Sequence, residues 1–144
     1  MFNFVALMPM RHSSSRVSGK NYRDFADGRP LFFHMAEKLL KCEVIDKVVI
    51  NTDSEVIKKL CKENFSEIII IDRPKSLSNE HCPMNDILLY DVNKVKSKFY
   101  IQTHSTNPLL SLDSLTNSLK YFKNNFPTYD SLFSVTKKQI RYWD

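Results

Sequence analysis

Short apolar runs alternate with amphipathic segments along this chain, and that alternation constrains the fold more than any other feature. Residues 2–8 are almost wholly apolar, which is typical of a strand buried on both faces of a parallel sheet. Further short runs predict strands at residues 47–51, 67–71, 98–102 and 131–135. Strands that alternate with helices in this way predict an α/β fold with a mostly parallel sheet, right-handed crossovers and helices on both faces.

Four helices are predicted between these strands by apolar residues at helical spacing, and each has a signal at its amino-terminal end. Pro30 and Pro83 open the first and third helices, because proline is preorganised for the start of a helix. Ser54 and Ser111 can cap the second and fourth helices. Asp53, next to Ser54, is expected to be a cap or turn residue and is not assigned as a metal ligand.

The size and composition of the chain fit one domain with a real core, since it has 144 residues of which 42% are hydrophobic. No apolar run approaches the roughly 20 residues that a membrane span requires, and the amino terminus lacks the basic start of a signal peptide. The three cysteines are widely spaced, so they predict reduced thiols and no zinc site. We therefore expect a cytoplasmic protein without a membrane segment.

The net charge of +5 raises the question of nucleic-acid binding. The lysines are scattered over the ends of segments, however, and form no single basic face with an aromatic platform. An anionic small ligand explains the excess charge as well. A nucleic-acid binder is therefore the poorest of the alternatives.

The segment from Pro9 to Arg29 has the most unusual composition, with five basic residues, four serines and no apolar periodicity. Structureless connections of this length inside a compact domain are usually functional. Backbone amides and hydroxyls can cradle phosphate oxygens there, and Arg and Lys can neutralise the charge on a leaving pyrophosphate. The segment lacks the spacing of a Walker A loop. The alternative is a solvated basic surface loop.

The position of this segment in the predicted sheet supports a binding site. In open α/β sheets, ligands bind beyond the carboxyl ends of the strands. The loops that follow the first, third and fourth predicted strands all lie at that edge, and they are also the loops with the most unusual composition. We therefore expect the ligand to bind between these three loops.

The same loops resemble the acylneuraminate cytidylyltransferases, the CMP-sialic acid synthetase family. The signature of that family runs Ala-Arg-Gly-Gly-Ser-Lys-Arg-Ile-Pro-Gly-Lys-Asn, and the residues that match it in register are Arg11, Ser14, Arg16, Gly19, Lys20 and Asn21. Residues 48–54, Arg73-Pro74 and residues 102–109 resemble further family segments in the same order. The chain departs from the signature where His12 and Ser13 replace two glycines, Ser15 replaces a lysine and Ser18 replaces a proline.

The resemblance implies a Rossmann-like nucleotide-diphospho-sugar transferase fold. It implies transfer of CMP from CTP to an acidic α-keto sugar, such as sialic acid or a related nonulosonic acid, with release of pyrophosphate. Residues 1–144 would form the CTP-binding part of a single cytidylyltransferase domain. Mg²⁺ is the implied cofactor, and its ligands are expected mainly beyond residue 144.

The resemblance also implies roles for individual residues. The residues implied to hold the triphosphate are Arg11, Ser14, Arg16, Lys20 and Asn21. Ser15 completes the nucleotide-binding candidates in this loop, and Arg11, Arg16 and Lys20 are the catalytic candidates that stabilise charge on the pyrophosphate. Arg73 would contact the cytosine, or else form an exposed salt bridge. Gln102 would serve the ribose or base, or else a cap or turn. His34 is expected to be structural, whereas His12 and His104 are placed near the pocket.

Several alternatives stay open from the sequence. The chain stops just after the last predicted strand, with no helix to cover that edge, so we expect a truncated chain or fragment that binds CTP without turnover. A full-length form is expected to be a homodimer. Alternative functions are a deoxy-octulosonate cytidylyltransferase, another sugar nucleotidyltransferase, or a noncatalytic nucleotide-sensing module.

Overall fold

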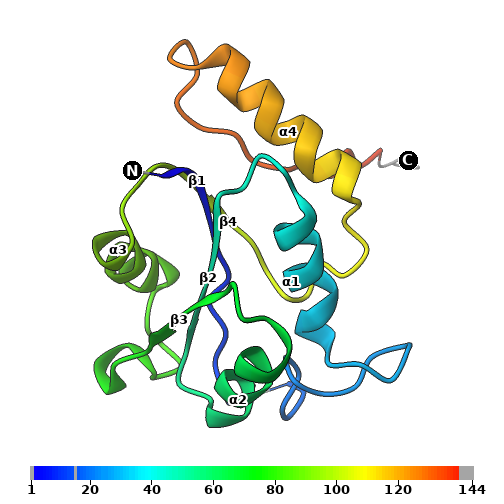
Figure 1. The fold of residues 1–144 in the computed structure, drawn as a ribbon, viewed down its shortest axis with the longest axis vertical. Coiled ribbons are helices and arrows are strands. Elements are labelled where there is room, and N and C mark those ends of the chain that lie inside the picture. The colour runs from blue at the N-terminus through cyan, green and yellow to red at the C-terminus, as the bar shows by residue number, and fades with distance from the viewer. Residues whose placement is uncertain (1, 15, 140–144) are drawn as a thin grey trace, which may run out of the picture.

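A four-stranded parallel sheet lies at the centre of the fold in the computed structural model, which describes residues 2–14 and 16–139 (Figure 1). The strands are β1 (Phe2–Leu7), β2 (Lys47–Thr52), β3 (Ile69–Asp72) and β4 (Ser97–Gln102). They lie in the order β3-β2-β1-β4, and Ala6 of β1 pairs with Val48 on one side and Ile101 on the other. Because all four strands are parallel, their carboxyl ends meet at one edge of the sheet.

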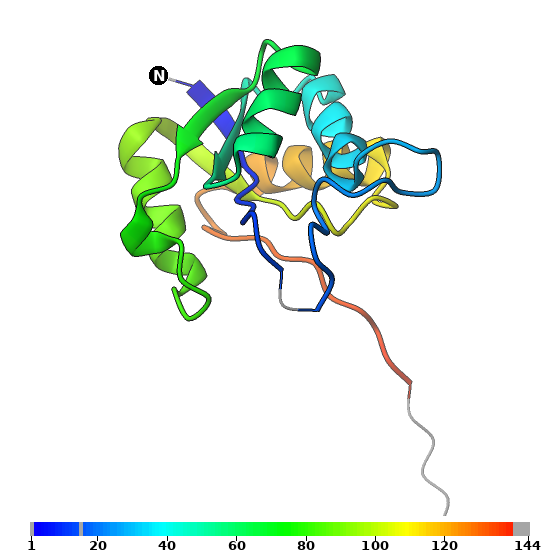
Figure 2. The same ribbon diagram turned by 90° about the horizontal axis from the view of Figure 1, so that it is seen from below.

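The helices cover both faces of this sheet, as predicted (Figures 1 and 2). Their bounds are α1 (Leu31–Lys41), α2 (Glu55–Asn64), α3 (Met84–Lys94) and α4 (Leu112–Asn125), and a short 3₁₀ turn, η1, spans Lys75–Leu77. Helices α1, α2 and α4 pack on one face, and α3 packs on the other. No helix among residues 2–14 and 16–139 has both the length and the apolar character needed to cross a membrane.

The two predicted serine caps are confirmed by hydrogen bonds at the helix starts. Ser54 Oγ accepts from the Ile57 amide of α2 at 3.4 Å, and Ser111 Oγ accepts from the Ser114 amide of α4 at 3.1 Å. Each cap satisfies one of the amides that a helix leaves without a partner in its first turn. These local signals therefore placed both helix starts correctly.

From Phe4 to Leu7, strand β1 is apolar because each of its faces packs against a helix layer, whereas Asn3 near its start is exposed. Phe4 and Ala6 belong to the core that α1, α2 and α4 cover, whereas Val5 and Leu7 belong to the core on the side of α3. Successive side chains of a strand point to opposite faces, so a strand between two layers needs apolar residues at every position. The prediction of a doubly covered strand is confirmed.

The strand predicted at residues 131–135 is wrong. After α4 the chain continues without regular structure, and residues 131–139 are exposed, including Phe133 at 81% and Val135 at 79% of full exposure. A short apolar run becomes a strand only where a neighbouring strand accepts its backbone hydrogen bonds, and within the described residues this segment pairs with none. The sheet described here therefore has four strands, with β4 at one edge.

Candidate functional site

A cavity of about 250 Å³ opens at the carboxyl edge of the sheet. Its walls come from the loops after β1, β3 and β4 and from the first turn of α3, which are the loops expected from the sequence. The lining residues are Pro9, Met10, Arg11, Ser13, Ser14, Lys20, Asn21, Arg73, Asn79, Glu80, Cys82, Met84, Ile87, His104, Ser105 and Thr106. Three parallel strands thus deliver three separate loops to one concave surface.

The loop after β1 is held in shape by Asn21, which is only 8% exposed. Asn21 Nδ2 donates to the Arg11 carbonyl at 3.0 Å, and Asn21 Oδ1 accepts from Ser105 Oγ at 2.7 Å. The first bond joins the two limbs of the loop, and the second joins the loop to the segment after β4. Because both ends of the amide are engaged with the protein, Asn21 shapes the cavity wall.

His12 ties the same loop to the start of α2. The His12 amide donates to Asp53 Oδ1 at 2.7 Å, and His12 Nδ1 lies 2.8 Å from Ser54 Oγ. The imidazole also stacks on the Tyr22 ring with 5.3 Å between ring centroids. Asp53 is therefore a turn residue, as expected, and His12 supports the loop without lining the cavity.

Gly19 allows a tight turn of the loop against the ring of Tyr22. Gly19 has a φ of +63°, and a Cβ built on it would lie 2.8 Å from Cε2 of Tyr22. Gly28 has a similar φ of +74°, but a Cβ there would meet nothing within 4 Å. The two glycines therefore share a left-handed backbone and differ in the space available to a side chain.

We expect Gly19→Ala to lower the free energy of unfolding by about 2–4 kcal/mol, because backbone strain adds to displacement of Tyr22. Gly28→Ala is the matched control and should cost only about 1–2 kcal/mol from the backbone alone. Urea unfolding followed by circular dichroism measures both values. Equal losses in the two variants would show that Tyr22 moves aside freely and that the contact has no structural role.

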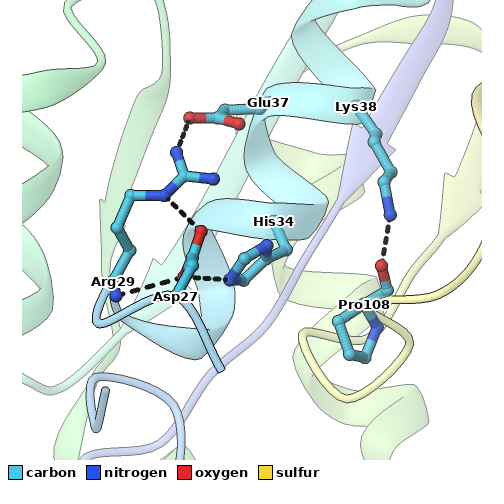
Figure 3. A network of polar contacts seen from close by, with 6 residues as sticks. All are labelled: Asp27, Arg29, His34, Glu37, Lys38 and Pro108. Carbon is cyan, nitrogen blue, oxygen red and sulfur yellow. Dashed lines mark hydrogen bonds and ion pairs between the residues drawn. The ribbon is translucent and has the colours of Figure 1, made fainter. Parts of the chain in front are cut away.

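The far end of the loop is anchored on α1 by a group of charged side chains, shown in Figure 3. Arg29 Nε contacts Asp27 Oδ2 at 2.8 Å, and Arg29 Nη1 contacts Glu37 Oε1 at 2.5 Å. His34 Nε2 lies 3.2 Å from Asp27 Oδ1. The hydrogen bond from Arg29 holds the pKa of Asp27 below its usual range. These contacts hold Arg29 away from the cavity and place His34 beside Asp27, and the structural role of His34 stays a prediction.

The loop after β4 is tied to three neighbouring segments. Lys38 of α1 donates through Nζ to the Pro108 carbonyl (Figure 3). The Thr103 amide donates to the Leu7 carbonyl at 2.9 Å, which continues the pairing of β4 with β1. Together with the bond from Ser105 to Asn21, these contacts hold His104, Ser105 and Thr106 in the cavity wall.

The structure places some of the candidate residues in the cavity wall and others outside it. Those that line the cavity are Arg11, Ser14, Lys20, Asn21 and Arg73. Arg16 is exposed and lies outside the wall, and Ser15 lies outside the described residues. Gln102 is exposed at the end of β4, where its Nε2 lies 3.5 Å from Nε2 of the cavity residue His104. The role of each residue stays a prediction.

Arg73 is buried against the end of β2, with 7% of its surface exposed. Its Nε donates to Asn51 Oδ1 at 2.6 Å, and its Nη2 donates to the Asn51 carbonyl at 3.1 Å. Burial lowers the pKa of Arg73, since water no longer solvates the charge. The alternative of an exposed salt bridge is therefore wrong, because Arg73 is buried and forms no ion pair with any residue described in the structure.

The charges in the cavity favour an anionic ligand. Arg11, Lys20 and Arg73 are the Arg and Lys residues of the wall, and Glu80 is the one carboxylate among the described lining residues. Cations converging in a partly closed site attract a polyanion more strongly than the same charges spread over an open surface. Sequence reasoning missed Glu80 and Cys82, because nothing in their spacing distinguishes them from other loop residues.

No metal centre is preformed in residues 2–14 and 16–139. Within these ranges, no group of three or more His, Cys, Asp or Glu side chains is placed to hold a metal ion. Hard cations such as Mg²⁺ take oxygen ligands, and Glu80 alone is too few for a protein cage. The polar groups that this cavity offers a ligand are therefore mainly the cationic and hydroxyl side chains of its wall.

Comparison with known proteins identifies relatives of this chain. Residues 5–144 match the family model described as Cytidylyltransferase. The pseudaminic acid cytidylyltransferase of Campylobacter jejuni is 27% identical over 138 residues, which cover 92% of this chain and 58% of that protein. The 3-deoxy-manno-octulosonate cytidylyltransferase of Trichlorobacter lovleyi is 22% identical over 121 residues, which cover 84% of this chain and 45% of that protein.

A solved structure shows the same fold. The CMP:2-keto-3-deoxy-manno-octonic acid synthetase complexed with CTP has a TM-score of 0.72 and 23% identity, over 85% of this chain and 48% of that one. This likeness confirms the predicted Rossmann-like nucleotidyltransferase fold. The chain spans little more than half the length of the first curated relative and less than half of the second.

Proposed function

The chain belongs to the cytidylyltransferase family, and from that premise we propose that residues 1–144 form the CTP-binding part of a single catalytic domain. The enzyme transfers CMP from CTP to an acidic α-keto sugar and releases pyrophosphate. The observation that carries this proposal is the cationic cavity at the carboxyl edge of the sheet, built from the three loops that resemble family segments. A homodimer of the complete protein is part of the same proposal.

In this proposal Arg11, Lys20 and Ser14 contact the triphosphate. The anomeric hydroxyl of the sugar gives up its proton to solvent and its oxygen forms a bond to the α-phosphorus, while the bond from that phosphorus to the bridging oxygen of pyrophosphate breaks. Negative charge moves onto the pyrophosphate, and a guanidinium and an ammonium held beside it stabilise that charge. The contribution of the protein is therefore mainly positioning and electrostatics.

The remaining candidates take different parts. Asn21 holds the loop in the shape that presents Arg11, because its amide bonds the Arg11 carbonyl. Arg16, which is exposed and outside the cavity wall, attracts the anionic nucleotide at longer range. Gln102, whose amide nitrogen lies 3.5 Å from His104 Nε2, serves the ribose or base through its side-chain amide. Arg73 contacts the cytosine, whose ring nitrogen and carbonyl oxygen accept hydrogen bonds from a guanidinium.

The acceptor sugar is an acidic one in this proposal, because two matching relatives are named for pseudaminic acid and for 3-deoxy-manno-octulosonate. The higher identity, 27% against 22%, favours a nonulosonic acid, and the octulosonate is the second candidate. Mg²⁺ is the proposed cofactor of the reaction with CTP. The described residues provide no group of three or more His, Cys, Asp or Glu side chains that could hold the ion.

Calorimetric titration with CTP, UTP, ATP and GTP, each with and without Mg²⁺, tests the nucleotide part of the proposal. We expect CTP to bind more tightly than the other three, because Arg73 contacts the base while Arg11 and Lys20 contact only the phosphates. Equal binding of all four would remove the role given to Arg73. In the complete protein, CTP binding without release of pyrophosphate would indicate a nucleotide sensor.

Thiol labelling shows where the nucleotide binds. Cys82 lines the cavity and is partly exposed, whereas Cys42 and Cys61 are each 1% exposed. Burial raises the pKa of the Cys61 thiol to about 12, so its thiolate is scarce at about pH 8. We expect one thiol of the folded protein to react, and saturating CTP to slow that reaction. An unchanged rate would place the nucleotide elsewhere.

A further inference from the structure

A chain of buried polar side chains runs from the interior of α3 to the wall of the cavity. Asp91 of α3 is 0% exposed, and its Oδ1 accepts from Asn51 Nδ2 at 2.5 Å. Asn51, also 0% exposed at the end of β2, accepts through Oδ1 from Arg73 Nε at 2.6 Å. Arg73 lines the cavity. A carboxylate and a guanidinium are thus linked through one amide, although they form no direct ion pair.

The two charged groups determine which way the amide points. An asparagine side chain donates at its nitrogen and accepts at its oxygen, so only one orientation suits a carboxylate on one side and a guanidinium on the other. The reverse orientation would place two acceptors together and two donors together. Asp91 therefore orients Asn51, and Asn51 orients the plane of Arg73, which it holds through both its side-chain oxygen and its carbonyl.

The hydrogen-bonded series Asp91–Asn51–Arg73 leaves one polar atom without a hydrogen-bond partner at each of its ends. Arg73 Nη1 and Asp91 Oδ2 are buried and have no hydrogen-bond partner within the described part of the chain. Burial raises the pKa of Asp91, as expected for a carboxylate removed from water. Unsatisfied buried polar groups reduce stability, and folded proteins rarely keep them without a functional reason. Arg73 retains hydrogen-bonding capacity that Asn51 does not use.

We propose that Asp91 is a positioning residue for nucleotide binding, which acts through Asn51 to hold the guanidinium of Arg73 in one plane at the cavity wall. This inference rests on the proposed CTP site and adds to it a residue of α3 that does not itself line the cavity. An Arg side chain held by one neighbour could rotate about its torsions. Because its guanidinium is already hydrogen-bonded to Asn51, Arg73 meets the base in a fixed geometry and loses little conformational freedom on binding.

The test uses Asp91→Asn, which keeps the volume of the side chain and an acceptor for Asn51 but removes the charge. We expect the Kd for CTP to rise about tenfold, as when a buried partner of a binding group is removed. The control is Asp113→Asn, the same chemical change at an exposed residue of α4, which should alter the Kd less than about twofold. Equal affinity of Asp91→Asn and the unmodified protein would overturn the proposal.

A double-variant cycle separates positioning from a general structural role. In the background of Arg73→Met, Asp91→Asn should have almost no further effect on the Kd, because the residue through which it acts is absent. A loss of the same size with and without Arg73 would overturn the proposal. So would a loss of affinity that merely follows a loss of folded protein, as measured by circular dichroism.

A measurement on the unmodified protein, without nucleotide, tests the positioning alone. The Nε–H of Arg73 is buried and hydrogen-bonded, so its NMR signal should exchange with solvent much more slowly than that of exposed Arg16. Asp91→Asn should speed this exchange. Rapid exchange of Arg73 in the unmodified protein would refute the positioning itself, whereas absence of any CTP binding with slow exchange would refute the proposed nucleotide site.

Discussion

Replacing Lys20 by Met is expected to weaken CTP binding about 10- to 100-fold, the largest loss of affinity that we predict for one substitution. Lys20 lies in the cavity wall and makes no ion pair with any described residue, so its ammonium is free to bind phosphate. Hydrogen bonds between charged groups are roughly twice as strong as neutral ones. Isothermal titration at about 0.15 M salt measures the change.

The control for this variant is Lys59→Met, which removes the same charge from an exposed position on α2. Its effect on the Kd should be less than about twofold, because exposed charges at a distance are screened by salt. Equal Kd values for Lys20→Met and Lys59→Met would show that the loop after β1 does not hold the triphosphate. The nucleotide would then have to bind by other groups of the cavity.

Replacing Phe32 by Ala is expected to lower the free energy of unfolding by about 3–5 kcal/mol. Phe32 is 0% exposed, and its ring makes edge contacts with Phe33 and Phe65 at centroid distances of 4.8 Å and 6.3 Å. Alanine would leave a cavity in the layer formed by α1, and the surrounding side chains could fill it only in part. Urea unfolding followed by circular dichroism gives the value.

Phe133→Ala provides the control for Phe32→Ala, since it removes the same ring from a position that is 81% exposed. We expect it to change the free energy of unfolding by less than about 0.5 kcal/mol. Similar losses for the two variants would mean that residues 131–139 pack against the domain in solution and that their exposed position is wrong. The pair therefore tests both the core and the corrected carboxyl-terminal segment.

Local sequence signals predicted most of the fold because the forces they report are local. The apolar run at residues 2–8 and the caps Ser54 and Ser111 depend on near neighbours in the chain. The run at residues 131–135 has the same local character, but a strand also needs a partner far away in the sequence. That requirement is tertiary, so composition alone could not distinguish a strand from an exposed tail.

The sequence predicted where in the fold the candidate site lies. Which residues of the loops line the cavity depends on tertiary packing. The basic loop and the parallel order of the strands placed Arg11 and Lys20 at the ligand edge of the sheet. Within that loop, the sequence could not distinguish Lys20 from Arg16, although the first lines the cavity and the second does not. The loop's shape depends on the left-handed backbone at Gly19 and on the hydrogen bonds of Asn21 to Arg11 and Ser105, which composition does not reveal.

The sequence by itself determined that alternating strands and helices would deliver cationic loops to one edge of a parallel sheet. Only the tertiary structure decided that Asp91, which lies 40 residues from Asn51 along the chain, would meet it behind Arg73. The physical reason is the distance along the sequence over which each interaction acts. Apolar periodicity and helix capping act over a few residues, whereas a buried hydrogen bond between layers exists only once the whole core has closed around it.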